Sequence, residues 1–583
     1  MISLTLTVLV FVPSLQNGFV YFDDHLYVIG NPVIKAFTWE NVEKILTQPF
    51  VGTYLPITML SYMADYGLFG LKPFGYHLTS LVFHVLCTLL VFLVTERLVD
   101  NPLVAFVTAT LFGVHTLHVE SVAWVSAQKD VLYGFGFLWA LYLYLSHSRT
   151  GRPFSGYYWP SLAVFVLSAL SKAQAVLLPI VLILIDVSLK RDFTLKALAR
   201  KIPFVVPAIA LAVVAVVVQK NAGAIRELNP LSTIYQPLFV GYALFSYLWR
   251  MVVPISLSCL YPYPVSDGQI NTNWVYASHL ILLAAGCAAY WIARRSRHVL
   301  FGVLFFMVTI APLLQLVPIG SALYADRYTY ISSIGLFLVT GIMFEKHAWR
   351  AGTRRYVLVA AGLLYLGFLS ANTFNRIRVW TDSMTLASDA LEKNPATWLL
   401  YATRAAAYEQ QGNTRLALND WNTVVRYMPP NVDNFVARGN VLMKEKDFAG
   451  AAADYSRAIE LAPSLTEAYY ARAEAYGNLG KLAEALADVE RVIAMKADFG
   501  NAYLVRGVVH LRMERPTAAV GDLTRAIELN PDAGLAYFNR AIAYAELRNF
   551  SAAYSDLLSA EQRGYAVDQS DIDDMAARSS DRW

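Results

Sequence analysis

Hydrophobic residues form long continuous runs over the first part of the chain. Eleven of these apolar runs lie near residues 1–18, 77–97, 102–118, 130–147, 157–171, 173–189, 202–219, 275–293, 298–317, 328–344 and 355–372. A twelfth, 236–253, contains Arg250 and stops before Pro254. Apolar runs of this length predict membrane-spanning helices, so we expect an all-α, polytopic helix bundle. The first run has no basic residues before it and no cleavage site, which favours a retained membrane helix over a signal peptide.

Basic residues indicate which connections face the cytoplasm. They are concentrated in four places, at 149–152, 190–201, 294–297 and 346–355. Between the second and third clusters the chain must cross the membrane an even number of times, and the runs 202–219 and 275–293 supply two crossings. We therefore expect 236–253 to lie at the outer interface or to be re-entrant. Eleven crossings place the N-terminus inside and the first long loop, 19–76, outside.

The chain after Trp398 repeats with a period of 34 residues. Small residues recur at Ala405, Gly439, Ala473, Gly507 and Ala541, and again at Ala417, Ala451, Ala485, Ala519 and Ala553. Such positions let antiparallel helices approach closely, and the pattern is the tetratricopeptide pattern. We expect an α-solenoid whose concave groove binds peptides or proteins. The predicted domains are a membrane domain (1–375), a linker (376–394), five repeats (395–565) and a polar tail (566–583).

The composition agrees with a membrane protein that carries a soluble part. Hydrophobic residues make up 56% of the chain and charged residues 15%, below the usual value of about a quarter. The formal net charge of +4 is too small to indicate a nucleic-acid partner. The cysteines, Cys87, Cys259 and Cys287, exclude a disulfide framework and a cysteine-rich metal site.

Two adjacent carboxylates, Asp23 and Asp24, follow the first apolar run. Like charges at a membrane edge are costly to desolvate, and their repulsion raises the pKa of one carboxyl group. Such a pair suits a general base or a cation site. The alternative is a helix N-cap or an exposed loop start, where aspartate is also favoured. Two later parts of the loop, beginning at Thr38 and at Leu55, have the spacing of short helices.

The second outer loop adds histidine, glutamate and lysine. His115 and His118 are three residues apart and Glu120 is close by. One interpretation is a metal site formed with the aspartate pair, and the other is a hydrogen-bonded network at a helix end. Lys129 either pairs with Asp130 or holds an anionic group.

Two arginines are candidates for binding phosphate. Arg327 follows Asp326 at the predicted outer membrane edge, and its planar guanidinium suits a phosphate group. The alternative is an arginine that pairs with Asp326 and reaches the interface. Arg226, in the loop after the run 202–219, is a second candidate. A carboxylate suits deprotonation of an acceptor, and basic groups or a metal suit a phosphate leaving group on a lipid-linked donor.

Several segments together resemble a known family. They are Asn17–Asp24, Tyr54–Thr58, Asp65–Leu71, His118–Trp124, Lys129–Leu132 and Ala325–Tyr330. In combination they resemble the transmembrane and tetratricopeptide-repeat O-mannosyltransferases and their bacterial relatives, which belong to the GT-C glycosyltransferase superfamily. The resemblance covers nearly the whole chain in the same domain order.

The resemblance implies an inverting transfer of a sugar from a polyprenyl-phosphate-type lipid donor to a protein acceptor. It implies an acidic catalytic base in the first outer loop, a role that carries over to Asp24 or Asp23, with Asp24 preferred. The sugar-donor site would be lined by His118, Glu120, Lys129 and Arg327. Members of the superfamily differ in metal use, so a divalent Mg or Mn ion held by Asp23, Asp24, His115, His118 and Glu120 is left open. A bacterial relative would lie in the inner membrane with periplasmic repeats.

Two other functions fit parts of the sequence. A non-enzymatic scaffold for pilus or envelope assembly would use the repeats, but it has no need of paired carboxylates with basic groups opposite. A transporter would place ionisable residues in mid-span, where His84 is the main example. The first outer loop therefore favours the transferase.

Overall fold

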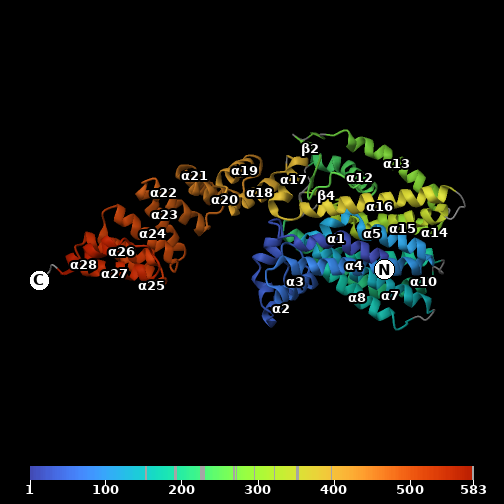
Figure 1. Ribbon diagram of the computed structural model, residues 1–583, viewed down its shortest axis with the longest axis horizontal. Helices are drawn as coiled ribbons and strands as arrows, with labels where there is room; N and C mark the ends of the chain where they lie inside the picture. Colours follow the sequence, from blue (N-terminus) through green and yellow to red (C-terminus); the bar gives the residue numbers. More distant parts are fainter. Residues whose placement is uncertain are drawn as a thin grey trace. The chain divides into compact units, whose positions relative to one another are not determined.

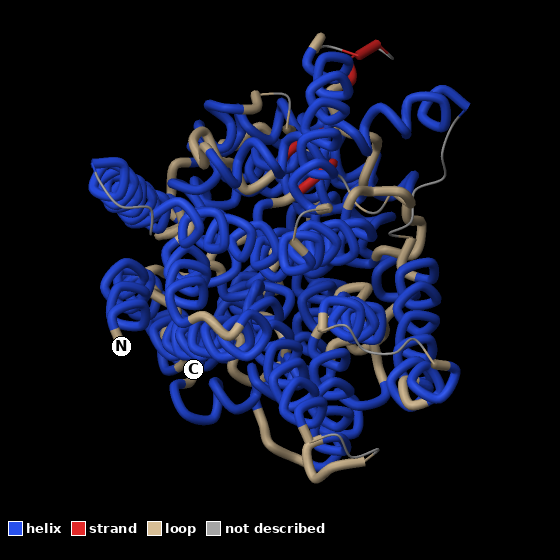
Figure 2. Tube along the Cα trace, turned by 90° about the vertical axis from the view of Figure 1, so that its right-hand side faces the viewer, coloured by secondary structure: helices blue, strands red, loops and turns tan. Residues whose placement is uncertain are grey.

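The computed structural model describes residues 1–150, 154–189, 194–223, 230–266, 269–270, 272–294, 296–318, 320, 322–348, 353–395 and 397–580. Within these residues the chain is almost entirely helical, with four strands of two or three residues each (Figure 2). The chain separates into two compact units, Met1–Thr397 and Trp398–Trp583. This architecture confirms the predicted all-α fold class.

The first unit is a helix bundle. Its helices are α1 (Ile2–Phe11), α2 (Trp39–Thr47), α3 (Pro56–Phe69), α4 (Pro73–Val99), α5 (Pro102–Val114), α6 (Val119–Ala123), α7 (Gln128–Arg149), α8 (Tyr158–Ser171), α9 (Leu178–Ser188), α10 (Leu195–Ala199), α11 (Ile202–Asn221), α12 (Pro230–Val252), α13 (Trp274–Ala293), α14 (Arg297–Ile310), α15 (Thr329–Ala348), α16 (Thr353–Val379) and α17 (Ser383–Lys393). The strands are β1 (Tyr261–Pro262), β2 (Val265–Ser266), β3 (Gln269–Ile270) and β4 (Ala322–Tyr324), and β1 pairs with β4 and β2 with β3, both antiparallel.

The apolar runs of the sequence are mostly helical. Among the described residues, five helices (α4, α11, α13, α15 and α16) are long and apolar enough to cross a membrane, or six if α5 and the segment beyond its 51° bend form one span. Shorter apolar helices are Ile2–Gln16, Tyr158–Ser171, Ala173–Ser188 and Arg297–Leu313. The chain is therefore an integral membrane protein, while the count of eleven crossings stays a prediction.

Close helix packing forms the centre of the bundle (Figure 1). Helix α4 packs against α5 and α7, and α15 packs against α5 and α14. A Cβ atom on Gly302 or Gly335 would collide with the other glycine's carbonyl oxygen, so these two positions let α14 and α15 approach closely.

The first loop folds around a small core of its own. Tyr27, Ile34, Ile45, Met59 and Tyr62 are buried together with residues from both short helices. Helix α2 begins at Thr38, whose hydroxyl accepts a hydrogen bond from the Asn41 amide, and α3 has Pro56 in its first turn. Both predicted short helices therefore form, and they fix the loop in front of α4 and α7.

The second unit is a row of five helix pairs and one final helix. The helices are α18 (Trp398–Gln410), α19 (Thr414–Tyr427), α20 (Val432–Lys444), α21 (Phe448–Leu461), α22 (Thr466–Asn478), α23 (Leu482–Met495), α24 (Gly500–Arg512), α25 (Pro516–Leu529), α26 (Gly534–Glu546), α27 (Phe550–Gln562) and α28 (Gln569–Ser580). A Cβ atom on Gly439 would lie 2.7 Å from the Tyr455 ring, which explains the small residue there. Residues 376–394, expected to be a linker, form the end of α16 and α17 and group with the first unit.

Each repeat also contains an ion pair, which the spacing of the small residues does not predict. An arginine in the first helix of each pair donates hydrogen bonds to both carboxylate oxygens of an aspartate in the second helix. The aspartate lies 16 residues after the arginine. The pairs are Arg404–Asp420, Arg438–Asp454, Arg472–Asp488, Arg506–Asp522 and Arg540–Asp556. These pairs repeat with the 34-residue period and join the two helices of each unit.

Candidate functional site

Asp24 is completely buried and holds two segments together. One carboxylate oxygen accepts hydrogen bonds from the amide of Ser126, at 2.8 Å, and from its hydroxyl. The other accepts from the amide of Val20 at 2.9 Å. Burial raises the pKa of Asp24 from 3.8 to about 6, although the hydrogen bonds from Ser126 and Val20 oppose this shift. With these hydrogen bonds, Asp24 ties the loop at Val20 to the segment that precedes α7.

Asp23 has a different environment from its neighbour. Its side chain is partly exposed. The structure shows no hydrogen bond or ion pair to its carboxylate from the described residues. Its negative charge acts on Lys129. Asp23 is therefore the more exposed member of the pair.

The segment before Lys129 is fixed by a second carboxylate from the first loop. Asp65, on α3, accepts hydrogen bonds from Gln128 Nε2 at 2.9 Å and from the Thr79 hydroxyl at 2.7 Å. Burial raises the pKa of Asp65. Asp24 and Asp65 thus hold Ser126 and Gln128, which places Lys129 at the first turn of α7.

Three basic side chains lie near the start of α7, and two of them, Arg327 and Lys172, lie 5.0 and 5.8 Å from the centre of the Tyr328 ring. Lys129 Nζ lies 4.8 Å from the centre of the Tyr27 ring. Arg327 pairs with Glu120, which also accepts a hydrogen bond from the Arg327 amide at 2.9 Å. Lys172, in the connection after α8, pairs with the buried Asp130.

Lys172 was not among the predicted site residues. Burial lowers its pKa to about 8, although the charge of Asp130 opposes the shift. The ammonium group therefore stays mainly protonated at neutral pH. The signal available in the sequence was a single lysine between the apolar runs 157–171 and 173–189, on the face predicted to be outside.

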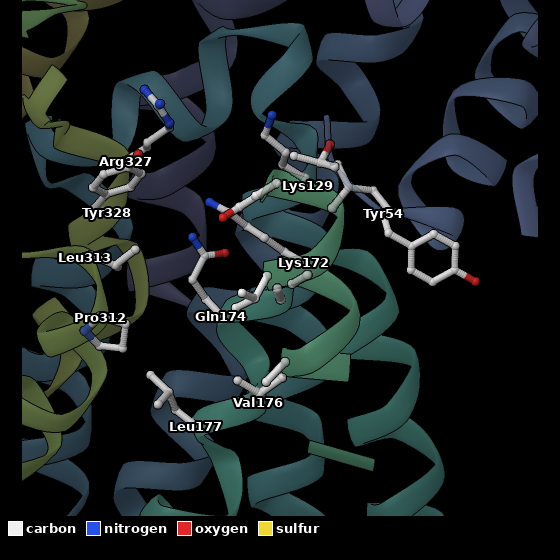
Figure 3. Close-up of a pocket in the computed structure, with 17 residues that line it drawn as sticks. Tyr54, Lys129, Lys172, Gln174, Val176, Leu177, Pro312, Leu313, Arg327 and Tyr328 are labelled. Carbon is white, nitrogen blue, oxygen red and sulfur yellow. The ribbon is translucent and has the colours of Figure 1, made fainter. Parts of the chain in front are cut away.

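A cavity of about 390 Å³ collects these cations at one end (Figure 3). Lys129, Lys172 and Arg327 line it together with Gln174, whose side-chain oxygen is buried and accepts no hydrogen bond from the described residues. The remaining wall is mostly apolar, from Val176, Leu177, Ala212, Ala215, Val216, Pro312 and Leu313. Figure 3 shows Val176 and Leu177 at the end away from Lys129 and Arg327. A site with cations at one end and apolar walls elsewhere suits a phosphate joined to a hydrocarbon chain.

The two predicted histidines are engaged inside the protein. His115 Nε2 lies 3.0 Å from the Met251 carbonyl oxygen, and His118 Nδ1 lies 2.8 Å from that of Phe112. His118 Nε2 contacts the hydroxyl of Ser333 at 3.2 Å. Neither histidine lines the cavity.

The five residues considered as metal ligands do not form a ligand set. Asp24 is bonded to Ser126, Glu120 to Arg327, and both histidines to backbone carbonyls. Among the described residues no three His, Cys, Asp or Glu side chains are arranged to hold a metal ion. The donor groups present here therefore do not fit a divalent cation. The other candidate, Arg226, lies outside the described residues.

Comparison with known proteins finds similar sequences for both halves of the chain. The family model described as "TPR repeat" matches residues 439–480, and the one described as "Tetratricopeptide repeat" matches 470–529 and 504–568. The chain is 24% identical over 468 residues to human "Protein O-mannosyl-transferase TMTC3", which covers 72% of the chain and 50% of that protein. It is 21% identical over 448 residues to "Protein O-mannosyl-transferase F38B6.6" of Caenorhabditis elegans, covering 73% and 62%.

A shorter match is closer in sequence. Human "Protein O-mannosyl-transferase TMTC1" is 33% identical over 151 residues, which cover 24% of the chain and 16% of that protein. The chain spans only 50% and 62% of the two longer-matching relatives. The repeats, the apolar helices and these alignments make the chain a relative of the transmembrane and tetratricopeptide-repeat O-mannosyltransferases.

Proposed function

We propose that the protein is a membrane glycosyltransferase that moves a sugar from a polyprenyl-phosphate-type lipid to a protein acceptor on the outer face of the membrane. The observation that carries the proposal is the cavity with Lys129, Lys172 and Arg327 at one end and apolar walls elsewhere. The names of the relatives, protein O-mannosyl-transferases, support transfer of a sugar to protein.

The three cations of the cavity differ in whether a carboxylate of the protein already pairs with them. Lys172 and Arg327 each have a carboxylate partner, Asp130 and Glu120. Lys129 has aromatic neighbours, and it forms no ion pair with another residue of the described part of the chain. Its ammonium group is therefore the one most available to a phosphate, while the other two contribute directed hydrogen bonds.

The apolar wall suits the lipid part of the sugar donor. Ala212, Ala215 and Val216 come from α11, one of the helices apolar enough to cross a membrane. Much of α11 is exposed, so the cavity has a wall that continues toward lipid. A hydrocarbon chain lying along this wall would leave its phosphate beside the three cations.

In the transfer step we assign the carboxylate of Asp23 as the base. Asp23 accepts the proton of an acceptor hydroxyl as the hydroxyl oxygen attacks the anomeric carbon from the side opposite the phosphate. The bond between that carbon and the phosphate oxygen breaks, and the sugar inverts its configuration. Lys129, Lys172 and Arg327 stabilise the charge that develops on the leaving phosphate. Because no metal-ligand set is present among the described residues, no step is assigned to a metal ion.

The repeats supply the acceptor in this proposal. Tetratricopeptide arrays bind peptides and proteins through their concave surface, and here they follow the membrane unit in the same chain. We place the protein in a bacterial inner membrane with the N-terminus in the cytoplasm and the repeats outside, as the basic connections predict.

Intact-mass spectrometry of exported proteins tests the function directly. A strain without the gene is compared with the same strain carrying either the unchanged gene or the Asp23→Asn variant. We expect one or a few proteins to lose a hexose-sized mass in the deletion strain, to regain it with the unchanged gene and not with the variant. Unchanged masses together with mislocalised partner proteins would favour the scaffold instead.

A further inference from the structure

The loop that carries Asp23 is tied to the corner between α16 and α17. The Gly18 amide donates to the Thr381 carbonyl oxygen at 2.8 Å. The Tyr21 amide donates to the Ser383 hydroxyl at 2.6 Å, and Asn17 Nδ2 donates to the Ile377 carbonyl oxygen at 3.2 Å. These three bonds span residues about 360 positions apart, so the loop depends on the end of the membrane unit for its position.

A stacked pair of tryptophans joins the same corner to the cations. The Trp380 ring stacks on Trp124 with centres 5.6 Å apart and an angle of 27°. Trp124 also lies 5.5 Å from the ring of Phe22, and the Arg327 guanidinium is 5.3 Å from its centre. Lys129 Nζ is 5.9 Å away from the same ring. Trp380 thus supports a ring that lies close to both Arg327 and Lys129.

The corner itself is firmly anchored. Arg376, on α16, pairs with Asp389 of α17 at 2.7 Å, and its side chain is buried. The Thr373 hydroxyl donates to the Val114 carbonyl oxygen at 2.8 Å, and Lys393 Nζ donates to that of Leu257 at 2.7 Å. A fixed support of this kind can set the position of a loop that is held by only a few bonds.

We propose that Ser383 and Trp380 are positioning residues that hold the Asp23 loop in its reactive place, so that the α16–α17 corner is part of the transferase site. This inference rests on the proposed function. The order of the helices along the chain supports the inference, because α17 is followed by α18, the first helix of the repeats. The segment that attaches the acceptor-binding unit is therefore the segment that supports the base.

The test compares serine variants of the full-length protein in lipid nanodiscs. Ser383→Ala removes the acceptor of the Tyr21 amide, and Ser383→Thr keeps a hydroxyl there. Ser388→Ala is the matched control, since Ser388 lies on the same helix and its hydroxyl hydrogen-bonds only Met384 Sδ, at 3.9 Å, among the described residues. Two quantities are measured: hydrogen exchange of the amides in 17–24, and the kinetics of transfer from a polyprenyl-phosphate sugar.

We expect Ser383→Ala to speed exchange in 17–24 and to lower kcat about tenfold, because a displaced base reacts more slowly. The KM for the lipid donor should not change, Ser383→Thr should restore both quantities, and Ser388→Ala should alter neither. Trp380→Leu should reproduce the loss of kcat. Unchanged exchange in Ser383→Ala, or faster exchange with unchanged kcat, would overturn the positioning role. Absence of transfer by the unmodified protein would instead remove the proposed function and, with it, the role of Asp23.

Discussion

The carboxylate of Asp24 accepts two hydrogen bonds from Ser126, one from the amide at 2.8 Å and one from the hydroxyl. These residues are 102 positions apart, and the contact joins the first long loop to the segment just before α7. The contact gives the two neighbouring aspartates different environments. Asp24 is fully buried and bonded, whereas Asp23 is partly exposed and its charge acts on Lys129.

Replacing Asp23 with asparagine should abolish transfer without unfolding the protein. Loss of a general base typically costs about 10²- to 10⁴-fold in rate, and the partly exposed side chain of Asp23 contributes little to stability. We expect kcat to fall by at least about a hundredfold, with thermal unfolding and binding of the lipid donor unchanged. Full activity of this variant would exclude Asp23 as the base.

Replacing Asp24 with asparagine should act through stability. An amide nitrogen in place of one carboxylate oxygen loses an acceptor for Ser126 or for the Val20 amide, which leaves a buried donor unpaired. An unpaired buried donor costs about 1–3 kcal/mol. We expect a lower unfolding temperature and faster hydrogen exchange in 17–24. A stable but inactive Asp24→Asn protein, together with an active Asp23→Asn protein, would reverse the two roles.

The raised pKa of Asp24 makes stability depend on pH. Its pKa is about 6 in the folded protein against 3.8 for a free side chain. Between these values the folded protein keeps a proton that the unfolded chain has released, so the free energy of unfolding falls as pH rises from about 4 to about 6. Thermal unfolding of the wild type and of Asp24→Asn across this range measures the effect. Equal pH dependence in both proteins would contradict it.

The sequence was sufficient to predict which loops meet, but not which side chains within them are buried. Lys129 and Arg327 were predicted for the sugar-donor site, and the structure places both in one cavity. His115 and His118 have the spacing of metal ligands. Two histidines that each hydrogen-bond a backbone carbonyl in the interior can have the same spacing, and this is what the structure shows. Whether a polar side chain faces a cavity depends on distant contacts that a local pattern does not contain.

Two features of the structure were not predicted from the sequence, one without a sequence pattern and one with a clear pattern. Lys172 is a single residue between apolar runs, and only its ion pair with Asp130 and its place in the cavity reveal its role. The arginines of the repeats, in contrast, recur every 34 residues, from Arg404 to Arg540. This period of charged residues is visible in the sequence and could have predicted them. Their aspartate partners lie at a constant distance of 16 residues.

Replacing Lys172 with glutamine should weaken binding of the lipid donor. Removing one cation from a phosphate site commonly costs about 1–3 kcal/mol, so we expect the KM for the donor to rise about tenfold or more. The exposed lysine variant Lys72→Gln is the control. Because Lys172→Gln leaves Asp130 buried without its cation, the double variant Lys172→Gln with Asp130→Asn is also measured. Donor binding restored in the double variant would show that Lys172 only neutralises Asp130.

Replacing Arg472 with methionine should destabilise the repeat unit. Arg472 bonds Asp488 within its own repeat and the hydroxyl of Ser456 in the repeat before it, at 2.9 Å. Leaving the mostly buried Asp488 without these bonds should cost about 1–3 kcal/mol, measured by thermal unfolding. Arg457→Met is the matched control, since Arg457 pairs with Glu460 on the surface and such pairs contribute little. Equal effects of the two variants would show that the ion pairs of the repeats are not structural.

Removing the repeats should separate acceptor recognition from sugar-donor binding. The cavity and the residues that hold Asp23 all lie before Trp398, where the second compact unit begins. A chain ending at Thr397 should therefore bind a polyprenyl-phosphate sugar with unchanged affinity, because every group that contacts the phosphate is retained. Transfer to the natural protein acceptor should fall sharply, because the acceptor loses the surface that raises its local concentration at the site. Loss of donor binding by a truncated protein that still unfolds cooperatively would show that the repeats contribute to the sugar-donor site, which would contradict this division of tasks.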